Sequence, residues 1–312
     1  MQVLRRIPER TMRPSVLTIG NFDGVHCGHQ ALLEMLVAKA KALGAAATVM
    51  TFEPHPREVF APEHAPARLA SMRDKLLQLA GHGVDCVFVC RFDAQFAALS
   101  AERFIEDVLV RGLNVRHLII GDDFRFGRGR QGDFAQLKEA GQRFGFSVET
   151  MPTLMQNGTR VSSSAVRKAL AQGEFERITH LLGRPYSIAG RVVSGRRLGR
   201  QLGYPTANIA LRHHKPALSG VFAVAVEGLA DTWLPAVANL GSRPTVSGNA
   251  RPNLEVHLLD WHGDCYGTHL RVHFLDKLRD EARYDSLDAL KAQIQRDEDA
   301  ARAWFAAHPI KN

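Results

Sequence analysis

Short apolar runs alternate with segments of helical periodicity through the first half of the chain. In Gln30–Leu43 the apolar residues recur at helical spacing, from Leu32 and Leu33 to Ala40. The apolar runs are typical of buried strands, and they are Val16–Ile19, Ala46–Phe52, Val84–Val89 and His117–Ile120. This alternation predicts a parallel sheet with helices packed on its faces. Ligands of such sheets bind beyond the carboxyl ends of the strands, so we expect the chemistry in the loops that follow them.

The pattern changes after Gly183-Arg184-Pro185. Two short helical patterns, Ser164–Gln172 and Phe175–Leu182, precede this point, and Pro185 would stop a helix. Beyond it lie β-rich runs without helices between them, around Tyr186–Val193, Val221–Val226, Leu234–Asn239, Asn253–Leu259 and Leu270–Leu275. They predict a compact antiparallel barrel, followed by a helix over Ser286–Phe305. A length of 312 residues also fits two domains.

The charge of the chain suggests partners that carry phosphate. Forty Lys and Arg against 32 Asp and Glu give a formal net charge of +8, which does not distinguish nucleotides from nucleic acid. Aromatic residues make up only 7% of the chain, and no aromatic–basic platform for stacking bases is apparent. We therefore expect no nucleic-acid partner.

Targeting and redox signals are few. The amino-terminal residues lack the apolar core of a signal peptide, and no apolar run approaches the roughly 20 residues that span a bilayer. The four cysteines, Cys27, Cys86, Cys90 and Cys265, form no C-x-x-C pair and no zinc spacing. We expect a soluble cytoplasmic protein with no membrane partner.

The segment Gly20–His29 follows the first predicted strand and opens the first helix. Its glycines let the backbone approach phosphate, and a helix start presents free N–H groups to an anion. His26 and His29 are the predicted catalytic pair, because donors there would stabilise charge that develops when an α-phosphate is attacked. A metal site is the alternative, but no third ligand is apparent. The predicted phosphate-binding residues are Gly20, Asn21, Phe22, Asp23, Gly24 and Gly28.

The pattern G-x-F-D-G-x-H-x-G-H is also too specific for an ordinary strand-to-helix turn. At average residue usage its fixed positions have a chance probability on the order of one in a billion per start point. We therefore interpret the segment as a nucleotide phosphate site.

Two further segments of the first half carry polar side chains at predicted element ends. Ser162, Ser163 and Ser164 precede a helical pattern, and Arg167 lies one turn later. These groups could converge on a triphosphate, although a serine there could equally be a simple helix cap. Asp122 and Asp123 follow a predicted strand, where a solvated turn and a ligand site both fit.

A basic, glycine-containing run opens the second half. Gly195 and Gly199 lie among four arginines that include Arg200, and such a loop could cradle phosphates. An ordinary solvated loop is the alternative, and the P-loop pattern is absent. Thr206 and Asn208 follow in Pro-Thr-Ala-Asn and carry oxygen ligands suited to Mg²⁺, although turn chemistry would also explain them.

Glu255 lies in a run of alternating polarity, Leu254–Leu258. The alternation places Glu255 and His257 on one face of a strand and the leucines on the other. A carboxylate held in this way could accept the proton of an attacking hydroxyl during phosphoryl transfer. A solvent-facing glutamate is the alternative.

Together these motifs resemble the bacterial bifunctional riboflavin kinase/FAD synthetases. Gly20–His29 is similar to their H-x-G-H nucleotidyltransferase signature, and supporting matches are Phe52–Pro56, Gly121–Gly127 and Val161–Arg167. The second half resembles their kinase domain in order and spacing over Gly190–Asn208, Ser219–Ala223, Val237–Thr245, Leu254–Asp260 and Tyr266-Gly267. Ser164 replaces the Thr usual in the family, and Ser194 stands where His is common.

The resemblance implies a Rossmann-like FMN adenylyltransferase domain over residues 1–184. It implies a riboflavin kinase domain over residues 185–312, with a six-stranded antiparallel barrel and a carboxy-terminal helix. Riboflavin would be phosphorylated by ATP to FMN, and AMP would then be transferred from ATP to FMN to give FAD and pyrophosphate. Thr206 and Asn208 match the family's Mg²⁺-binding pair and Glu255 its catalytic base.

The flavin site is also implied by the resemblance. It assigns flavin binding to Asp122, Asp123, Phe124 and Arg279, while the Gly121–Gly127 loop could seat either the flavin nucleotide or ATP. The expected partners are riboflavin, FMN and ATP, with at most weak self-association. The alternative hypothesis is an adenylyl- or cytidylyltransferase that acts on another acceptor, in which the barrel only binds the substrate.

Overall fold

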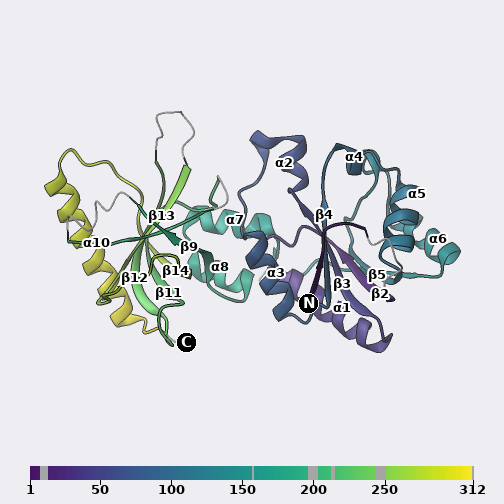
Figure 1. The fold of residues 1–312 in the computed structure, drawn as a ribbon, viewed down its shortest axis with the longest axis horizontal. Helices are drawn as coiled ribbons and strands as arrows, with labels where there is room; N and C mark the ends of the chain where they lie inside the picture. The colour runs from purple at the N-terminus through teal and green to yellow at the C-terminus, as the bar shows by residue number, and fades with distance from the viewer. Residues whose placement is uncertain (8–12, 157, 196–202, 212–214, 244–250, 311–312) are drawn as a thin grey trace. The chain divides into compact units, whose positions relative to one another are not determined.

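The contacts of the chain divide it into two compact units (Figure 1). The computed structural model describes residues 1–7, 13–156, 158–195, 203–211, 215–243 and 251–310. The first unit is Met1–Pro66 with Met72–Ser162, and the second is Ala67–Ser71 with Ser163–Asn312. The division by contacts therefore falls before the two short helices that precede Pro185.

The first unit contains a six-stranded sheet in which every pair of neighbours is parallel. The strand order is β1-β4-β3-β2-β5-β6. The strands are β1 (Gln2–Leu4), β2 (Ser15–Ile19), β3 (Ala46–Glu53), β4 (Cys86–Arg91), β5 (Val115–Gly121) and β6 (Ser147–Met151). The predicted parallel sheet is confirmed, and β1 and β6 are additions to the predicted strands.

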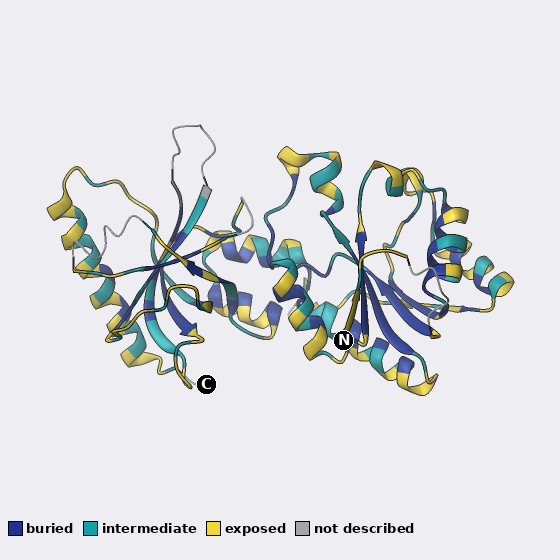
Figure 2. Cartoon of the chain, viewed as in Figure 1, coloured by how far each residue is buried: buried dark blue, intermediate teal, exposed yellow. Residues whose placement is uncertain are grey.

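Helices cover both faces of this sheet. Alternation along β2 sends Val16 toward α1 (Cys27–Ala42) and α3 (Met72–Gly81), and sends Leu17 toward the π-helix η2 (Phe104–Gly112) and α6 (Phe134–Phe144). Figure 2 shows the strands buried between these layers. The remaining short elements are α2 (Pro56–Phe60), η1 (Pro62–His64), α4 (Ala94–Ala97), α5 (Ala101–Arg103), η3 (Arg128–Arg130) and the hairpin of β7 (Met155–Gln156) and β8 (Thr159–Arg160).

The strand order fixes where a ligand of this sheet would bind. From β2 the chain continues to β3 on one side, whereas β5 flanks β2 on the other. Such a reversal leaves a crevice beyond the carboxyl ends of the two strands. The segment after Ile19 and the segment after Gly121 leave the sheet at this point, so the topology brings two of the sequence motifs to one edge.

The second unit is a closed antiparallel barrel in the order β10-β13-β12-β11-β14-β9, with β9 and β10 closing it. Its strands are β9 (Tyr186–Val193), β10 (Ala207–Ile209), β11 (Gly220–Glu227), β12 (Leu234–Arg243), β13 (Arg251–Leu258) and β14 (His269–Arg279). The six-stranded barrel is confirmed, with the short strand β10 as an addition.

Among the described residues, the helices of the barrel unit are α7 (Ser163–Gln172), α8 (Phe175–Leu182) and α10 (Leu287–Ala307). Phe175 of α8 meets the edge of Phe222 on β11, with ring centroids 5.9 Å apart. Ala301 of α10 is fully buried against Ala223 and Leu259. The predicted carboxy-terminal helix is thus confirmed as a packed part of the barrel. No helix in the described ranges is long and apolar enough to traverse a membrane.

Candidate functional site

The first motif forms a tight loop that ends in the first turn of α1. His26 caps the helix, since its Nδ1 accepts from the backbone N–H of His29 at 3.3 Å. The two imidazole rings stack with centroids 3.7 Å apart. A Cβ on Gly28 would lie 3.2 Å from the His26 ring, so a glycine there leaves room for this stack. The predicted catalytic pair is therefore brought together at a helix start.

The Phe22 ring packs against the ring of His29. Its side chain is fully buried, and its ring centroid lies 4.8 Å from that of His29. Phe22 also has a φ of 47° and Gly24 one of 85°, so the loop turns sharply through left-handed backbone. Because the Phe22 ring is in the core, only its backbone could take the predicted part in phosphate binding. Asp23, which has the same predicted role, is buried as well.

His29 is held neutral. Burial, aided by His26 and by the charge of Lys75, lowers the pKa of His29 well below its ordinary value. Its Nδ1 and the Oδ1 of Asn21 are buried polar atoms without a hydrogen-bond partner in the described part of the chain. Buried polar atoms are nearly always paired, so two such atoms in one loop indicate a place for a polar ligand.

Lys75, a residue of α3, is linked to this loop through Thr51, and the sequence analysis did not predict it as a site residue. The residue is only 2% exposed, and its Nζ lies 3.4 Å from Oγ1 of Thr51 at the end of β3. That hydroxyl donates in turn to the carbonyl of Asn21 at 3.1 Å. A signal was present in the sequence, because Lys75 lies one helical turn before Leu79 and therefore on the apolar face of α3.

The loop after β5 carries the predicted flavin-binding residues at the neighbouring strand end. Asp123 accepts from a guanidinium nitrogen of Arg160 at 3.0 Å, and Asp122 from the Thr153 hydroxyl at 3.3 Å. Phe124 stacks on Phe126 with centroids 5.8 Å apart. The carboxylates are thus oriented by side chains of the segments that follow β6.

An aromatic group lies at the ends of β3 and β4, also missed by sequence reasoning. Phe92 contacts Phe52 and Phe60 edge to face, each at 5.6 Å between centroids, and Phe96 at 5.8 Å. Phe60 is 66% exposed. Aromatic rings grouped at the carboxyl ends of strands suit a planar heteroaromatic ligand.

The serine segment lies at the start of α7, as its pattern predicts. Ser163 and Ser164 occupy the first turn, Ser162 precedes it, and Arg167 follows one turn on. The Nε of Arg167 donates to the carbonyl of Ala67 at 2.6 Å. Their predicted contact with a triphosphate stays a prediction.

In the barrel, cross-strand register aligns three polar residues. Glu255 of β13 lies opposite Asn208 of β10 on one side and opposite Asn239 of β12 on the other. The Nδ2 of Asn253, two residues before Glu255, donates to Oε1 of Glu255 at 2.7 Å. Asn239 and Asn253 were not among the predicted site residues: the approach of Asn239 depends on register, whereas Asn253 shares the strand face of Glu255 and could have been found from the alternation.

The predicted metal pair fits this row. Asn208 is 8% exposed, and a Cβ on Gly195 would lie 2.4 Å from its Nδ2, so its amide occupies the space over that glycine. Thr206 lies just before β10 and is half-buried. Of the predicted ATP-binding residues of this half, Gly199 and Arg200 lie outside the described residues.

Arg279, predicted to bind flavin, is engaged with α10. Its Nε and one terminal nitrogen donate to the two carboxylate oxygens of Asp297, each at 2.7 Å. The other terminal nitrogen donates to the carbonyl of Asp280 at 2.9 Å. The bonds to the Asp297 carboxylate raise the pKa of Arg279 further, and together the bonds fix its guanidinium at the end of β14.

Comparisons with known proteins agree with this geometry. A family model described as FAD synthetase matches residues 9–165, and one described as riboflavin kinase matches residues 182–305. The chain is 51% identical over 308 residues to the bifunctional riboflavin kinase/FMN adenylyltransferase of Escherichia coli strain K12, covering 98% of both chains. The relative of the same description from Pseudomonas fluorescens is 50% identical over 310 residues, again with 98% of both covered.

The chain belongs to the bifunctional riboflavin kinase/FMN adenylyltransferase family. A crystal structure described as a macrolide-efflux protein from Streptococcus pneumoniae has the same fold, with a TM-score of 0.82 and 29% identity over 97% of this chain and 100% of that one. The two predicted activities of FMN and FAD biosynthesis, riboflavin kinase and FAD synthetase, are confirmed.

Proposed function

We propose that the two activities use separate sites, with adenylyl transfer in residues 1–184 and the kinase in residues 185–312. The separate ranges of the two family models support this division. The polar groups described above also form two clusters, one at the crevice between β2 and β5 and one on the face of β10, β13 and β12.

At the first site, the phosphate of FMN attacks the α-phosphate of ATP, and pyrophosphate leaves. The observation that carries this assignment is the stacked His26–His29 pair at the start of α1. A neutral His29 with an unsatisfied ring nitrogen can hydrogen-bond the phosphate where charge develops. Gly20, Gly24 and Gly28 allow the backbone to approach the phosphates. Ser162, Ser163, Ser164 and Arg167 would contact the triphosphate tail.

The flavin ring of FMN would lie against the aromatic group of Phe52, Phe60, Phe92 and Phe96. Exposed Phe60 offers it an apolar face. Asp122, Asp123 and Phe124 follow β5, on the other side of β2 from β3, and would contact the polar edge of the flavin nucleotide.

At the second site, Glu255 takes the proton of the ribityl 5′-hydroxyl as that oxygen attacks the γ-phosphoryl of ATP, the bond to the β-phosphate breaks, and ADP leaves. The observation that carries this assignment is the row of Asn208, Glu255 and Asn239 across neighbouring strands. Asn253 orients the carboxylate through its bond to Oε1. Gly195, Gly199 and Arg200 would bind the phosphates of ATP.

Mg²⁺ suits the oxygen donors of this second site. The Thr206 hydroxyl and the Asn208 amide oxygen are hard, neutral ligands, and Asn208 is held in place over Gly195. A bound Mg²⁺ supplies positive charge that offsets the charge of the transferring phosphoryl group. The chain's own part is to present these two oxygens beside Glu255.

For the wider setting of the enzyme, we propose a cytoplasmic location, small-molecule substrates without a nucleic-acid partner, and at most weak self-association. The small share of aromatic residues supports the absence of a base-stacking surface. Sedimentation at several protein concentrations, with and without single-stranded RNA, would test both partner statements.

The experiment that tests the main proposal is incubation with riboflavin, ATP and Mg²⁺, followed by chromatography of the flavins. FMN should appear first and FAD later, and FMN supplied directly should give FAD without riboflavin. Replacing ATP by CTP should abolish both products. Formation of neither FMN nor FAD with ATP would overturn the proposal.

A further inference from the structure

His257 lies on the same face of β13 as Glu255, two residues further along the strand. Its Nδ1 is 2.9 Å from the carbonyl oxygen of Pro205. A carbonyl can only accept, so Nδ1 carries the proton and donates. Pro205 immediately precedes Thr206, the first of the two proposed Mg²⁺ ligands.

This contact lies where the backbone ladder ends. Pairing of β10 with β13 begins at Ala207, opposite Val256. If the ladder continued, Thr206 would be the next residue, opposite His257. The His257 side chain instead bonds to Pro205, the residue before Thr206. A side-chain hydrogen bond therefore fixes the chain just beyond the point where backbone pairing ends.

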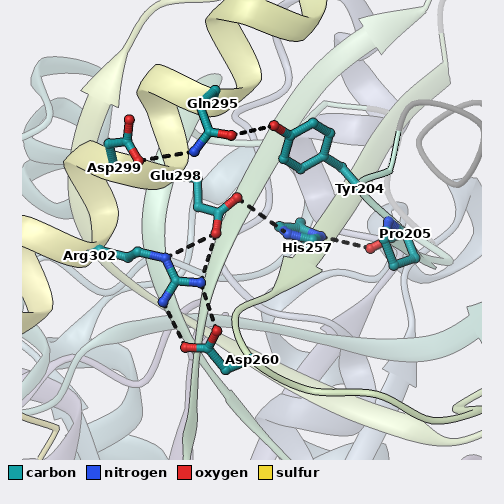
Figure 3. A network of polar contacts seen from close by, with 8 residues as sticks. All are labelled: Tyr204, Pro205, His257, Asp260, Gln295, Glu298, Asp299 and Arg302. Atoms are coloured by element: carbon teal, nitrogen blue, oxygen red, sulfur yellow. Dashed lines mark hydrogen bonds and ion pairs between the residues drawn. The ribbon is translucent and has the colours of Figure 1, made fainter.

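The same segment is held from α10 (Figure 3). The Tyr204 hydroxyl donates to Oε1 of Gln295 at 2.7 Å. The Tyr204 ring meets His257 edge to face, with centroids 5.6 Å apart. Two neighbouring residues, Tyr204 and Pro205, are therefore each fixed by a different element of the barrel unit.

Charged groups lock α10 to β13 at this place. Nε2 of His257 faces a carboxylate oxygen of Glu298 at 4.0 Å. Arg302 joins that carboxylate, at 2.7 Å, to Asp260 just beyond β13, which it contacts at 2.7 and 2.8 Å. Figure 3 shows the unbroken series from Pro205 through His257, Glu298 and Arg302 to Asp260.

We propose that His257 is a positioning residue of the kinase, which sets the Thr206–Asn208 segment relative to Glu255, with the Tyr204–Gln295 bond as a second anchor. The inference rests on the proposed kinase site. Its consequence is that α10, although remote from the sequence motifs, is part of the machinery that places the phosphate-side ligands. A displacement of about 1 Å in a reacting group can cost about 100-fold in rate.

The test compares His257→Leu with His257→Asn in the full chain. Leucine fills the space but cannot donate, whereas the amide nitrogen of asparagine can take the place of Nδ1. His262→Leu is the matched control, because His262 is an exposed histidine in the loop after β13. FMN formation, adenylylation of supplied FMN and hydrogen exchange of residues 203–209 are measured on the same samples.

His257→Leu should lower kcat for FMN formation by about 10- to 100-fold and raise the Mg²⁺ concentration for half-maximal rate. Exchange should become faster in residues 203–209 and stay unchanged in β11 and β12. His257→Asn should restore most of the rate and the protection, and FAD formation from FMN should be normal in every variant. Equal kinase rates and equal exchange in the Leu, Asn and control variants would overturn the inference.

Tyr204→Phe keeps the inference testable if His257→Leu does not fold. It removes only the hydroxyl that bonds Gln295, and we expect about a fivefold loss of FMN formation, the effect of one ordinary hydrogen bond. An unchanged kinase rate in this variant, with unchanged exchange in 203–209, would count against the second anchor and against the proposal. Glu255→Gln, assayed in parallel, separates the cases: if it keeps full kinase activity, the proposed site itself is wrong.

Discussion

The two sites are built in opposite ways. At the proposed adenylyl-transfer site the histidine pair and the glycines lie in one continuous segment, Gly20–His29, and a helix start and the strand order of a parallel sheet place them. At the proposed kinase site the groups lie on different strands, and cross-strand register places them, as for Asn208 and Glu255. The first design depends on local backbone shape and the second on the alignment of distant segments. A substitution that abolishes one activity should therefore leave the other activity intact.

Glu255→Gln should have the largest effect that separates the two sites. The amide cannot accept a proton at neutral pH, so FMN formation should fall by about 10²–10⁴-fold, as expected for loss of a general base. Adenylylation of supplied FMN should continue. The measurement is the initial rate of each step, followed by flavin chromatography. Loss of both rates in a folded variant would contradict the separation of the two sites.

His29→Ala should give the converse result. Removing the neutral imidazole from the start of α1 should lower FAD formation on the order of 100-fold, because a fixed donor at the reacting phosphate is lost. FMN should accumulate from riboflavin at the normal rate. His64→Ala, at an exposed histidine, is the control. Full FAD synthesis in His29→Ala would remove His29 from the mechanism.

Gly195→Ala tests how closely the kinase site is packed. The new Cβ would lie 2.4 Å from Nδ2 of Asn208, so that side chain must move. We expect FMN formation to fall about tenfold and the Mg²⁺ requirement to rise. Gly81→Ala, where an added Cβ would meet nothing within 4 Å, is the matched control. Identical kinetics in the two variants would show that Asn208 is not needed where it lies.

Lys75→Met tests whether the buried ammonium group keeps the pKa of His29 low. The methionine keeps the volume in the core but removes a positive charge that lowers the pKa of His29. The His29 pKa, followed by NMR of the imidazole, should move up toward its ordinary value. FAD formation should fall by about tenfold because the link through Thr51 to Asn21 is lost. An unmoved His29 pKa would contradict the electrostatic link.

The smallest effect is expected on stability at mildly acidic pH. Burial lowers the pKa of His29, His117 and His273. As the pH falls, these histidines are therefore protonated in the unfolded chain before they are protonated in the folded chain. The free energy of unfolding should therefore decrease as pH falls below about 6.5. Calorimetry between pH 7.5 and 5.5 would measure it. His117→Gln should flatten this dependence, and a steeper slope would show that the sign is wrong.

The sequence predicted what is periodic or contiguous. Helix α8 and strand β9 begin and end where their patterns predict, and the His26–His29 pair meets as its motif implies. Strand β10 was missed because three residues are too few to show a period.

There are physical reasons why the sequence did not predict the other site residues. Lys75 is a charged residue in the core, which composition argues against. The alignment of Glu255 with Asn239 and the bond of His257 depend on register, and the partner of His257 lies about fifty positions away. Patterns read along the chain carry no such information.

The two sheets also differ in how they end, which bears on aggregation. Each barrel strand pairs with neighbours on both sides, so no strand is left to recruit another chain. The parallel sheet is open and ends at β1 and β6. At one end β1 is only three residues long, and at the other β6 carries Glu149, whose carboxylate is held by His117. A short strand and a charged strand are poor templates for strand addition, so both edges of this sheet are protected against pairing with another chain.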